Sequence, residues 1–469
     1  MERTEQKSVV QVIIAVFLTI AACVVSLLHV NIAIPILFLV FVLITMTRFS
    51  KAVFFMMVAL IPCIGITVTI SEIPILASIP ILGNWDAPLS DFIALPLLLI
   101  YGYSMFAKEK SQTLEHHLQE HLPGIAVYGA FLLLAFLTIF RAPEIWFGQS
   151  FNYFVRFVLF SYLAYVALPF WMTKTKEDIE TIVKLISGVG VVVMLYGAVS
   201  LLMNEPFWGV WRRVSPFPFG DFYPIGPNHN QLAEILIYTA PFTWLMSRQT
   251  QGQTHKWWVI ATFAVILTAL LTFARTAWIA IFAQGVLMYR LIQPRNIRER
   301  IIEWWPLLVG ILGISVYMGV FSASDLVASS TATRLDLTKI SLLQFSKTPF
   351  FGNGIGTFLP SISSSYVFQI EYGGGVEAHG FIQKLLFETG IVGLALFVLF
   401  FGYLISNLIL THRKQMEGFY KDVVTTAVLA LTGTFVYQIF NTSYFSPKLW
   451  FLVGFACIVW YGNWKFNRI

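Results

Sequence analysis

Charged residues are scarce in this sequence: Asp, Glu, Lys and Arg make up only 12% of its 469 residues. A water-soluble domain carries about 25% charged residues and roughly 45–50% apolar ones. Here the apolar share is 57% and the mean hydropathy is +0.76. The shortage of charge excludes a water-soluble globule. It indicates an all-α fold, a polytopic bundle of transmembrane helices.

Cysteine and clustered charge are also rare. Cys23, Cys63 and Cys457 all fall in apolar segments, which excludes a disulfide framework and a thiolate zinc site. Glu377 and His379 give only a weak pairing at metal-ligand spacing, so we expect neither a metal nor another cofactor. The formal net charge is +6, but no run of five like charges occurs, so we expect no nucleic-acid partner.

Long apolar runs, in contrast, fill the chain. A helix that crosses the hydrocarbon core needs about 20 mostly apolar residues. Scanning for such runs predicts twelve to fourteen spans, with a bundle over residues 1–321, a large external loop over 322–390 and further spans over 391–469. The candidates are residues 9–28, 32–46, 53–70, 92–106, 122–140, 151–171, 182–203, 232–246, 257–273, 278–291, 304–321, 391–410, 423–440 and 449–464.

Basic residues are distributed unevenly among the predicted loops. With the N-terminus in the cytoplasm, 19 of the 30 Lys and Arg residues fall in cytoplasmic segments and nine in external ones. Cytoplasmic loops of membrane proteins carry such an excess of Lys and Arg. We therefore predict a multi-pass protein, surrounded by membrane lipids, with both termini in the cytoplasm.

Three charged residues fall in the outer half of the membrane under this topology: Arg156, Glu234 and Arg275. Ionisable groups inside spans are energetically expensive, so they often mark functional sites. The alternative is that Arg156 pairs with Glu234 for structure and that Arg275 only reaches the lipid headgroups. The sequence alone leaves both interpretations open.

The external loop 322–390 holds two glycine motifs on either side of a histidine. Short turns suffice for connection, so a loop of roughly 70 residues indicates function. Residues 349–358 read Pro-Phe-Phe-Gly-Asn-Gly-Ile-Gly-Thr-Phe, which lacks the Gly-Lys-Ser/Thr ending of a nucleotide-binding P-loop. His379 follows, and Gly390 and Gly393 stand at the start of the next predicted span.

Two upstream segments complete an ordered set of motifs. Residues 226–233 read Gly-Pro-Asn-His-Asn-Gln-Leu-Ala at the start of a predicted span, and residues 273–278 read Phe-Ala-Arg-Thr-Ala-Trp. Over residues 204–440 these motifs together resemble the O-antigen ligase and polymerase family of bacterial membrane proteins. That family usually places Asn, Ser or Gln directly after the histidine, where this chain has Gly380.

The resemblance implies an enzyme of the bacterial cytoplasmic membrane that acts on its outer face in surface polysaccharide biosynthesis. It would move a glycan, without a metal, from an undecaprenyl-diphosphate donor to a hydroxyl group of a glycan or lipid acceptor. His379 would be the general base, kept neutral by the adjoining helix N-terminus. Arg275 and Arg334 would bind the diphosphate through charge-assisted hydrogen bonds and stabilise it as a leaving group.

Other residues of the matching segments, together with one arginine inside a span, are candidates for substrate binding. They are Arg212, Arg213, Asn228, Asn230, Arg156 and Glu388. For Glu388 an alternative is open, because a carboxylate at the start of a span can equally hold an arginine or backbone groups.

A different class of protein also fits the span count. A polytopic transporter or flippase for lipid-linked oligosaccharide would have as many spans, although such proteins often show two repeated halves and no repeat is visible here. Within the resembled family, ligase and polymerase share the same arginine and histidine roles, so the sequence does not separate them.

Overall fold

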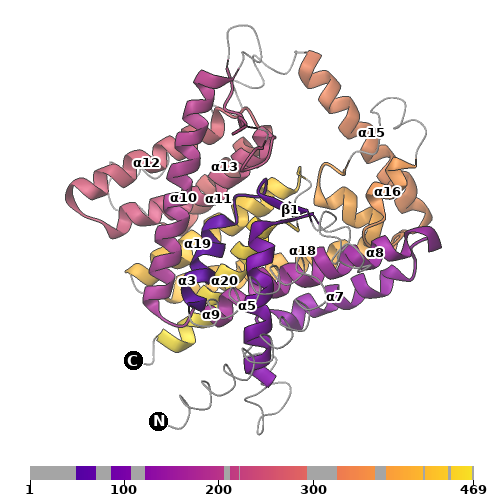
Figure 1. Cartoon of the computed structure of the whole chain (residues 1–469), viewed down its shortest axis with the longest axis horizontal. Coiled ribbons are helices and arrows are strands. Elements are labelled where there is room, and N and C mark those ends of the chain that lie inside the picture. The colour runs from indigo at the N-terminus through magenta and orange to yellow at the C-terminus, as the bar shows by residue number, and fades with distance from the viewer. Residues whose placement is uncertain are drawn as a thin grey trace, which may run out of the picture.

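The structure is a computed structural model, and it describes residues 49–69, 86–106, 122–204, 212–220, 222–292, 325–364, 377–415, 418–441 and 445–466. The described part is built almost entirely of helices, with one short antiparallel strand pair (Figure 1). Its elements are α3 (Ser50–Leu60), β1 (Thr67–Thr69), β2 (Asp86–Pro88), α5 (Leu89–Phe106), α7 (Ile125–Ile139), η2 (Glu144–Trp146), α8 (Phe147–Tyr153), η3 (Phe154–Phe160), η4 (Leu163–Ala167), α9 (Leu168–Met172), α10 (Lys176–Met203), α11 (His229–Gln249), α12 (Gly252–Leu270), α13 (Arg275–Leu291), α15 (Asp325–Lys347), α16 (Phe358–Ser363), α18 (Phe381–Lys414), α19 (Phe419–Gln438) and α20 (Pro447–Phe466).

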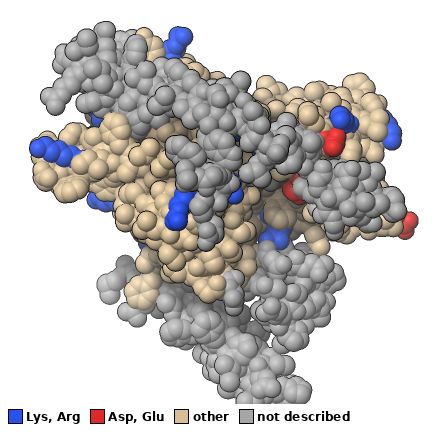
Figure 2. All heavy atoms as spheres, turned by 90° about the horizontal axis from the view of Figure 1, so that it is seen from above, with Lys and Arg blue, Asp and Glu red and all other residues tan. Residues whose placement is uncertain are grey.

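Several of these helices can cross a membrane. Those long and apolar enough within the described residues are Glu144–Met172, Lys176–Met203, Phe381–Lys414 and Phe419–Gln438. Shorter apolar helices accompany them: Ser50–Leu60, Leu89–Gly102, Ile125–Ile139 and Pro447–Tyr461. On the face seen in Figure 2, charged side chains of both signs are scattered over a surface of mostly uncharged residues. The all-α polytopic fold is confirmed, and the count of twelve to fourteen spans stays a prediction.

One predicted span, residues 53–70, differs from the structure. Its helix α3 ends at Leu60, and the chain continues into the strand β1, where Thr67 pairs with Pro88 of β2. Pro62 explains the early end, because proline has no N–H to donate to the Val58 carbonyl four residues earlier, so the helical ladder stops there. Most other predicted spans in the described part coincide with helices, while 9–28, 32–46 and 304–321 lie outside the described residues.

Helix ends that were predicted to share one side of the membrane meet in the structure. At one end of the bundle, the hydroxyl of Tyr437 near the end of α19 donates to the carbonyl of Asn230 at the start of α11, at 2.7 Å. At the opposite end, Nε2 of Gln249 on α11 donates to Oδ2 of Asp422 on α19, at 3.0 Å. The two helices are therefore antiparallel neighbours, as the predicted alternation of loops requires.

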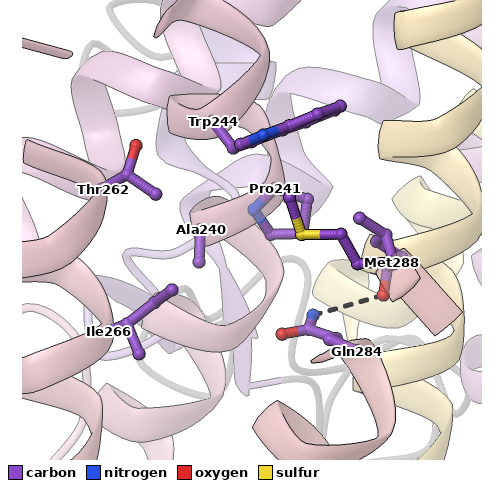
Figure 3. Close-up of a pocket in the computed structure, with 8 residues that line it drawn as sticks. Ala240, Pro241, Trp244, Thr262, Ile266, Gln284 and Met288 are labelled. Carbon is purple, nitrogen blue, oxygen red and sulfur yellow. Dashed lines mark hydrogen bonds between the residues drawn. The ribbon is translucent and has the colours of Figure 1, made fainter. Parts of the chain in front are cut away.

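Helix α11 lies at the centre of the bundle, in contact with α10, α12, α13 and α19. Pro241 interrupts its hydrogen-bond ladder, because proline lacks the N–H that would bond to the Ile237 carbonyl four residues earlier. Gln284 of α13 takes that place: its Nε2 donates to Ile237 O at 3.1 Å and to Leu429 O of α19 at 3.2 Å. The amide thus ties three helices together beside a small apolar pocket (Figure 3).

The predicted external loop has a small hydrophobic core of its own. Leu337 of α15, Phe358 and Ile362 of α16, and Ala378 and Phe387 around the start of α18 are buried together. Figure 1 shows α15 and α16 at one edge of the molecule, across from α12. Helix α15 packs on α18. This cluster fixes α15 against the first turns of α18, where two of the predicted site residues lie.

Candidate active site

Helix α18 is broken at Gly390, whose backbone angles are φ 67° and ψ −167°. This conformation is open almost only to glycine, because a side chain would clash with the backbone. The break also interrupts the ladder in which each carbonyl accepts from the N–H four residues later. Two carbonyls before the break and two N–H groups after it therefore need other partners.

The glycine-rich segment 349–358 replaces the lost helical turn. Its N–H groups donate to the two carbonyls before the break, and its carbonyls accept from the two N–H groups after it. The bonds are Asn353 N to Phe387 O (2.9 Å), Gly354 N to Glu388 O (2.9 Å), Ile391 N to Pro349 O (2.9 Å) and Val392 N to Phe350 O (3.3 Å). The two glycine motifs therefore form one structural joint, which sets the direction of the first half of α18.

His379 stands immediately before α18, whose first residue is Phe381 and whose N-cap is Gly380. A larger residue at position 380 does not fit, because its Cβ would lie 2.2 Å from the carbonyl oxygen of Ile439. This close approach explains why the chain departs from the resembled family at Gly380. The N–H of His379 donates instead to Oε1 of Gln383, at 3.2 Å.

The imidazole of His379 is half-buried and close to charged groups. Burial lowers the pKa of His379, the guanidinium of Arg334 lowers it further, and the carboxylate of Glu377 opposes both effects. A lowered pKa keeps the imidazole neutral and able to accept a proton. The lowered pKa of His379 has two causes that the sequence did not show, burial and Arg334, and the contribution of the helix dipole stays a prediction.

Arg334, on α15, also lies within electrostatic range of a second histidine. His229 is the first residue of α11; burial and the charges of Arg213 and Arg334 lower the pKa of His229 to about 3. Two neutral imidazoles therefore flank one guanidinium. The sequence analysis did not single out His229, although its place between Asn228 and Asn230 at the start of a predicted span was the available signal.

The two asparagines at the start of α11 serve its backbone. Asn228 is the N-cap: its side chain accepts from the N–H of Asn230 at 2.9 Å, and Gln231 Oε1 accepts from the N–H of Asn228 at 3.2 Å. This reciprocal capping box fixes where the helix begins and places the positive end of its dipole at His229. Substrate contacts of Asn228 and Asn230 stay a prediction.

The adjacent arginines Arg212 and Arg213 have different neighbours. Nη1 of Arg212 donates to the carbonyls of Leu201 and Leu202 at the end of α10, at 3.0 and 3.1 Å. A cation at a helix C-terminus stabilises the helix dipole. Arg213 is half-buried, which lowers its pKa, and its charge acts on His229. The structure thus gives Arg212 a capping role and brings Arg213 to the histidine.

Arg275 is the first residue of α13 and is half-buried. The side chain of the next residue, Thr276, hydrogen-bonds to the Tyr437 hydroxyl, which also contacts Asn230 on α11. Tyr437 in turn lies within electrostatic range of Arg334. Arg275 therefore begins its helix at the same end of the bundle as Arg334.

Glu388 is fully buried on the first half of α18. Its Oε1 accepts from the N–H of Phe358 at 3.1 Å and lies 4.0 Å from Nζ of Lys384. Lys384 is itself buried and pairs with Glu377 at 2.8 Å, and its Nζ lies 4.6 Å above the Tyr153 ring. This is the arrangement expected from the alternative interpretation, in which Glu388 holds backbone groups.

The remaining charged residues of the predicted spans also contact charged or polar protein groups. Glu234 is fully buried, pairs with the equally buried Lys448, and accepts from Nε2 of Gln438 at 2.6 Å. Arg156 lies within electrostatic range of Asp91. The partners Lys448 and Asp91 differ from the Arg156–Glu234 pair of the alternative interpretation. Substrate binding by Arg156 stays a prediction.

The structure brings together four residues, from the turn before α18, the start of α11, α15 and the segment before α11: His379, His229, Arg334 and Arg213. Neutral imidazoles accept protons and guanidinium groups bind phosphate-like anions. Across the ranges that the structure describes, no group of three or more His, Cys, Asp or Glu side chains is placed to hold a metal ion. The arrangement can therefore bind an anionic group and accept a proton next to it.

Comparison with known proteins agrees with the resemblance seen in the sequence. Residues 260–398 match a family described as O-antigen ligase. The matched residues run from α12 into α18 and include Arg275, Arg334 and His379, whereas the segment around His229 lies outside the match. No curated protein matches the chain. The resemblance to the O-antigen ligase family is confirmed over these residues, and it supports a membrane protein that transfers glycans.

Proposed function

Given the match to the O-antigen ligase family, we propose that this chain is a membrane glycosyltransferase of surface polysaccharide biosynthesis. It transfers or polymerises a glycan from an undecaprenyl-diphosphate donor onto a hydroxyl acceptor at the outer face of the bacterial cytoplasmic membrane, and both of its termini lie in the cytoplasm. The observation that carries the proposal is the position of Arg334, which lies close enough to His379 and His229 to act on the pKa of both.

The arginines supply the binding site for the donor's diphosphate. Arg334 and Arg213 approach His229 at the start of α11, where the positive end of the helix dipole adds to their charge. Arg275 joins them from the start of α13. A guanidinium fixed in place stabilises the leaving diphosphate more strongly as its charge grows in the transition state. Transfer without a divalent cation is the expectation, and activity in excess EDTA tests it.

His379 is the general base. As the acceptor oxygen bonds to the anomeric carbon of the donor sugar, its proton passes to the imidazole. The bond from that carbon to the diphosphate oxygen breaks, and undecaprenyl diphosphate leaves. The pKa of His379 is lowered, so the imidazole is unprotonated and ready for this step at neutral pH.

The test compares surface glycans of a deletion strain complemented with wild type, His379→Ala or Arg334→Ala at equal membrane abundance. We expect both variants to lose attached or long-chain polysaccharide and to accumulate lipid-linked glycan. Exposed residues elsewhere in the bundle provide matched controls: His255→Ala on α12 and Arg290→Ala at the end of α13 keep the wild-type profile.

The size and side of the accumulated glycan separate the remaining alternatives. Single repeat units indicate a polymerase, and full chains indicate a ligase. A flippase would instead leave the lipid-linked glycan on the inner face, where an enzyme added to intact spheroplasts does not reach it. A normal surface profile in both the His379→Ala and Arg334→Ala strains would refute the assigned roles.

A further inference from the structure

A chain of three hydrogen bonds joins the backbone of His379 to that of Arg334. The N–H of His379 donates to Oε1 of Gln383 at 3.2 Å. Nε2 of Gln383 donates to Oγ1 of Thr338 on α15. The Thr338 hydroxyl donates in turn to the carbonyl of Arg334, at 2.7 Å. These bonds link two segments that are 45 residues apart at the Gln383–Thr338 contact.

The donor-to-acceptor direction of this series of hydrogen bonds is fixed by the groups at its two ends. The Thr338 hydroxyl has one proton, which goes to the Arg334 carbonyl, so its oxygen is left to accept from a donor. The amide nitrogen of Gln383 is that donor, which turns the amide oxygen toward the His379 N–H. Gly380, the N-cap of α18, has no side chain to bind that N–H. Gln383 therefore occupies a position that no shorter residue could serve in the same way.

The spacing puts the two site residues opposite each other. Arg334 and Thr338 are four residues apart on α15 and lie on the same helix face. On α18, Gln383 reaches back four residues to His379. The inner pair, Thr338 and Gln383, is hydrogen-bonded, and the outer pair, Arg334 and His379, lies within electrostatic range. The inner contact thus sets the separation of the outer one.

We propose that Thr338 and Gln383 are positioning residues that hold the general base His379 in register with the diphosphate-binding Arg334. This inference rests on the proposed function. Both residues act through their neighbours, because their hydrogen-bonding atoms are engaged with protein groups. The buried cluster around Leu337 and Phe387 still holds α15 on α18 when this contact is lost, but the hydrogen bond that aligns Arg334 with His379 is gone. A displacement of about 1 Å at a reacting group can cost on the order of 100-fold in rate.

The test uses the full chain in lipid nanodiscs with lipid-linked glycan extracted from the deletion strain as the donor. Thr338→Val keeps the shape of the side chain and removes the hydroxyl, whereas Thr338→Ser keeps the hydroxyl. We expect Thr338→Val and Gln383→Leu each to lower kcat by about 10- to 100-fold with little change in the donor KM. We expect Thr338→Ser to keep a kcat near that of the wild type.

Two further readouts separate positioning from a general loss of structure. Because the two residues form one contact, the double variant Thr338→Val/Gln383→Leu should lose no more activity than the worse single variant. In Thr338→Val, Arg334 no longer acts fully on His379, so the pKa of His379 rises and the acidic limb of the pH–rate profile moves to higher pH. A loss of folding alone leaves that limb in place.

Matched control variants exist elsewhere in the chain. Thr181 on α10 makes the same bond to a carbonyl four residues back, at 2.7 Å, and Gln249 bridges α11 to α19 at the opposite end of the bundle. Thr181→Val and Gln249→Leu should both keep the wild-type kcat and pH profile. Equal effects of these controls and the Thr338 and Gln383 variants would overturn the proposal.

Failure of the positioning role and failure of the proposed function give different results. If wild type transfers glycan, His379→Ala abolishes transfer, and Thr338→Val is as active as Thr338→Ser, the positioning proposal is wrong and the function stands. Multiplicative losses in the double variant also refute it. If the wild type transfers no glycan, the proposed function itself is wrong. If the wild type transfers glycan and His379→Ala keeps its rate, the assignment of His379 as the base is wrong, and the positioning proposal falls with it.

Discussion

The joint at Gly390 predicts a large effect from a single added methyl group. Gly390→Ala places a Cβ 2.4 Å from the backbone carbon and oxygen of Phe350 and 2.7 Å from the nitrogen of Phe351. These are backbone atoms of the glycine-rich segment, so the clash is relieved only if that segment moves away from α18. The same substitution also forces alanine into a backbone conformation reserved for glycine, at φ 67°.

The expected cost follows from these two effects. Backbone strain of this kind costs about 1–3 kcal/mol. Displacing Phe350 breaks at least the 3.3 Å bond from Val392 and weakens the 2.9 Å bond from Ile391 to Pro349, at about 1 kcal/mol each. We therefore expect Gly390→Ala to lower the free energy of unfolding by roughly 2–5 kcal/mol. We also expect a loss of activity, because the first half of α18 carries the His379 turn.

Thermal unfolding of the full chain in lipid nanodiscs measures this effect. The control is Gly402→Ala, farther along α18, where an added Cβ meets nothing within 4 Å. Replacing a glycine by alanine in a regular helix stabilises by about 0.5–1 kcal/mol, so Gly402→Ala should match or exceed wild type. If Gly390→Ala unfolds at the same temperature as Gly402→Ala, the account of the joint is wrong.

Two further predictions follow from the site and the core. The lowered pKa of His379 means that the imidazole stays neutral below its usual pKa of about 6.5, so kcat/KM should hold its plateau to below pH 6.5 and decline only in more acidic buffer; a pH–rate profile half-lost at or above pH 6.5 contradicts this. Gln284→Leu leaves the Ile237 carbonyl buried without its donor and should destabilise the protein by about 1–3 kcal/mol in thermal unfolding. Adding Pro241→Ala restores a helical N–H to that carbonyl and should recover most of the loss, whereas no recovery would show that the carbonyl is not the cause.

The predicted spans and the structure agree where a helix is defined by its own apolar run. The antiparallel arrangement of α11 and α19 also agrees with the predicted alternation of the spans. Which helix ends face the cytoplasm stays a prediction from the basic residues. The second half of the segment 53–70 was predicted wrongly, since apolar composition alone does not show that Pro62, which lacks an N–H, ends α3. Motif order was enough to single out His379 and the arginines.

Which of these residues act together depended on the tertiary structure. Arg212 and Arg213 are neighbours in sequence, yet one caps α10 and the other approaches His229. For Glu388 the sequence left two interpretations open, and the structure adds that its carboxylate is buried and accepts from the N–H of Phe358. Side-chain direction and burial come from the packing of several helices, and periodicity along one segment does not encode them.

By itself, the sequence determined that the chain is a polytopic helical membrane protein that resembles the O-antigen ligase family, because hydrophobic length and motif order can be read along the chain. The tertiary structure decided that the two glycine motifs form one joint and that His229 shares Arg334 with His379. It also decided that Gln383 and Thr338 connect the two halves of the site. These contacts join residues far apart in the chain, and only folding brings them within hydrogen-bond or electrostatic range.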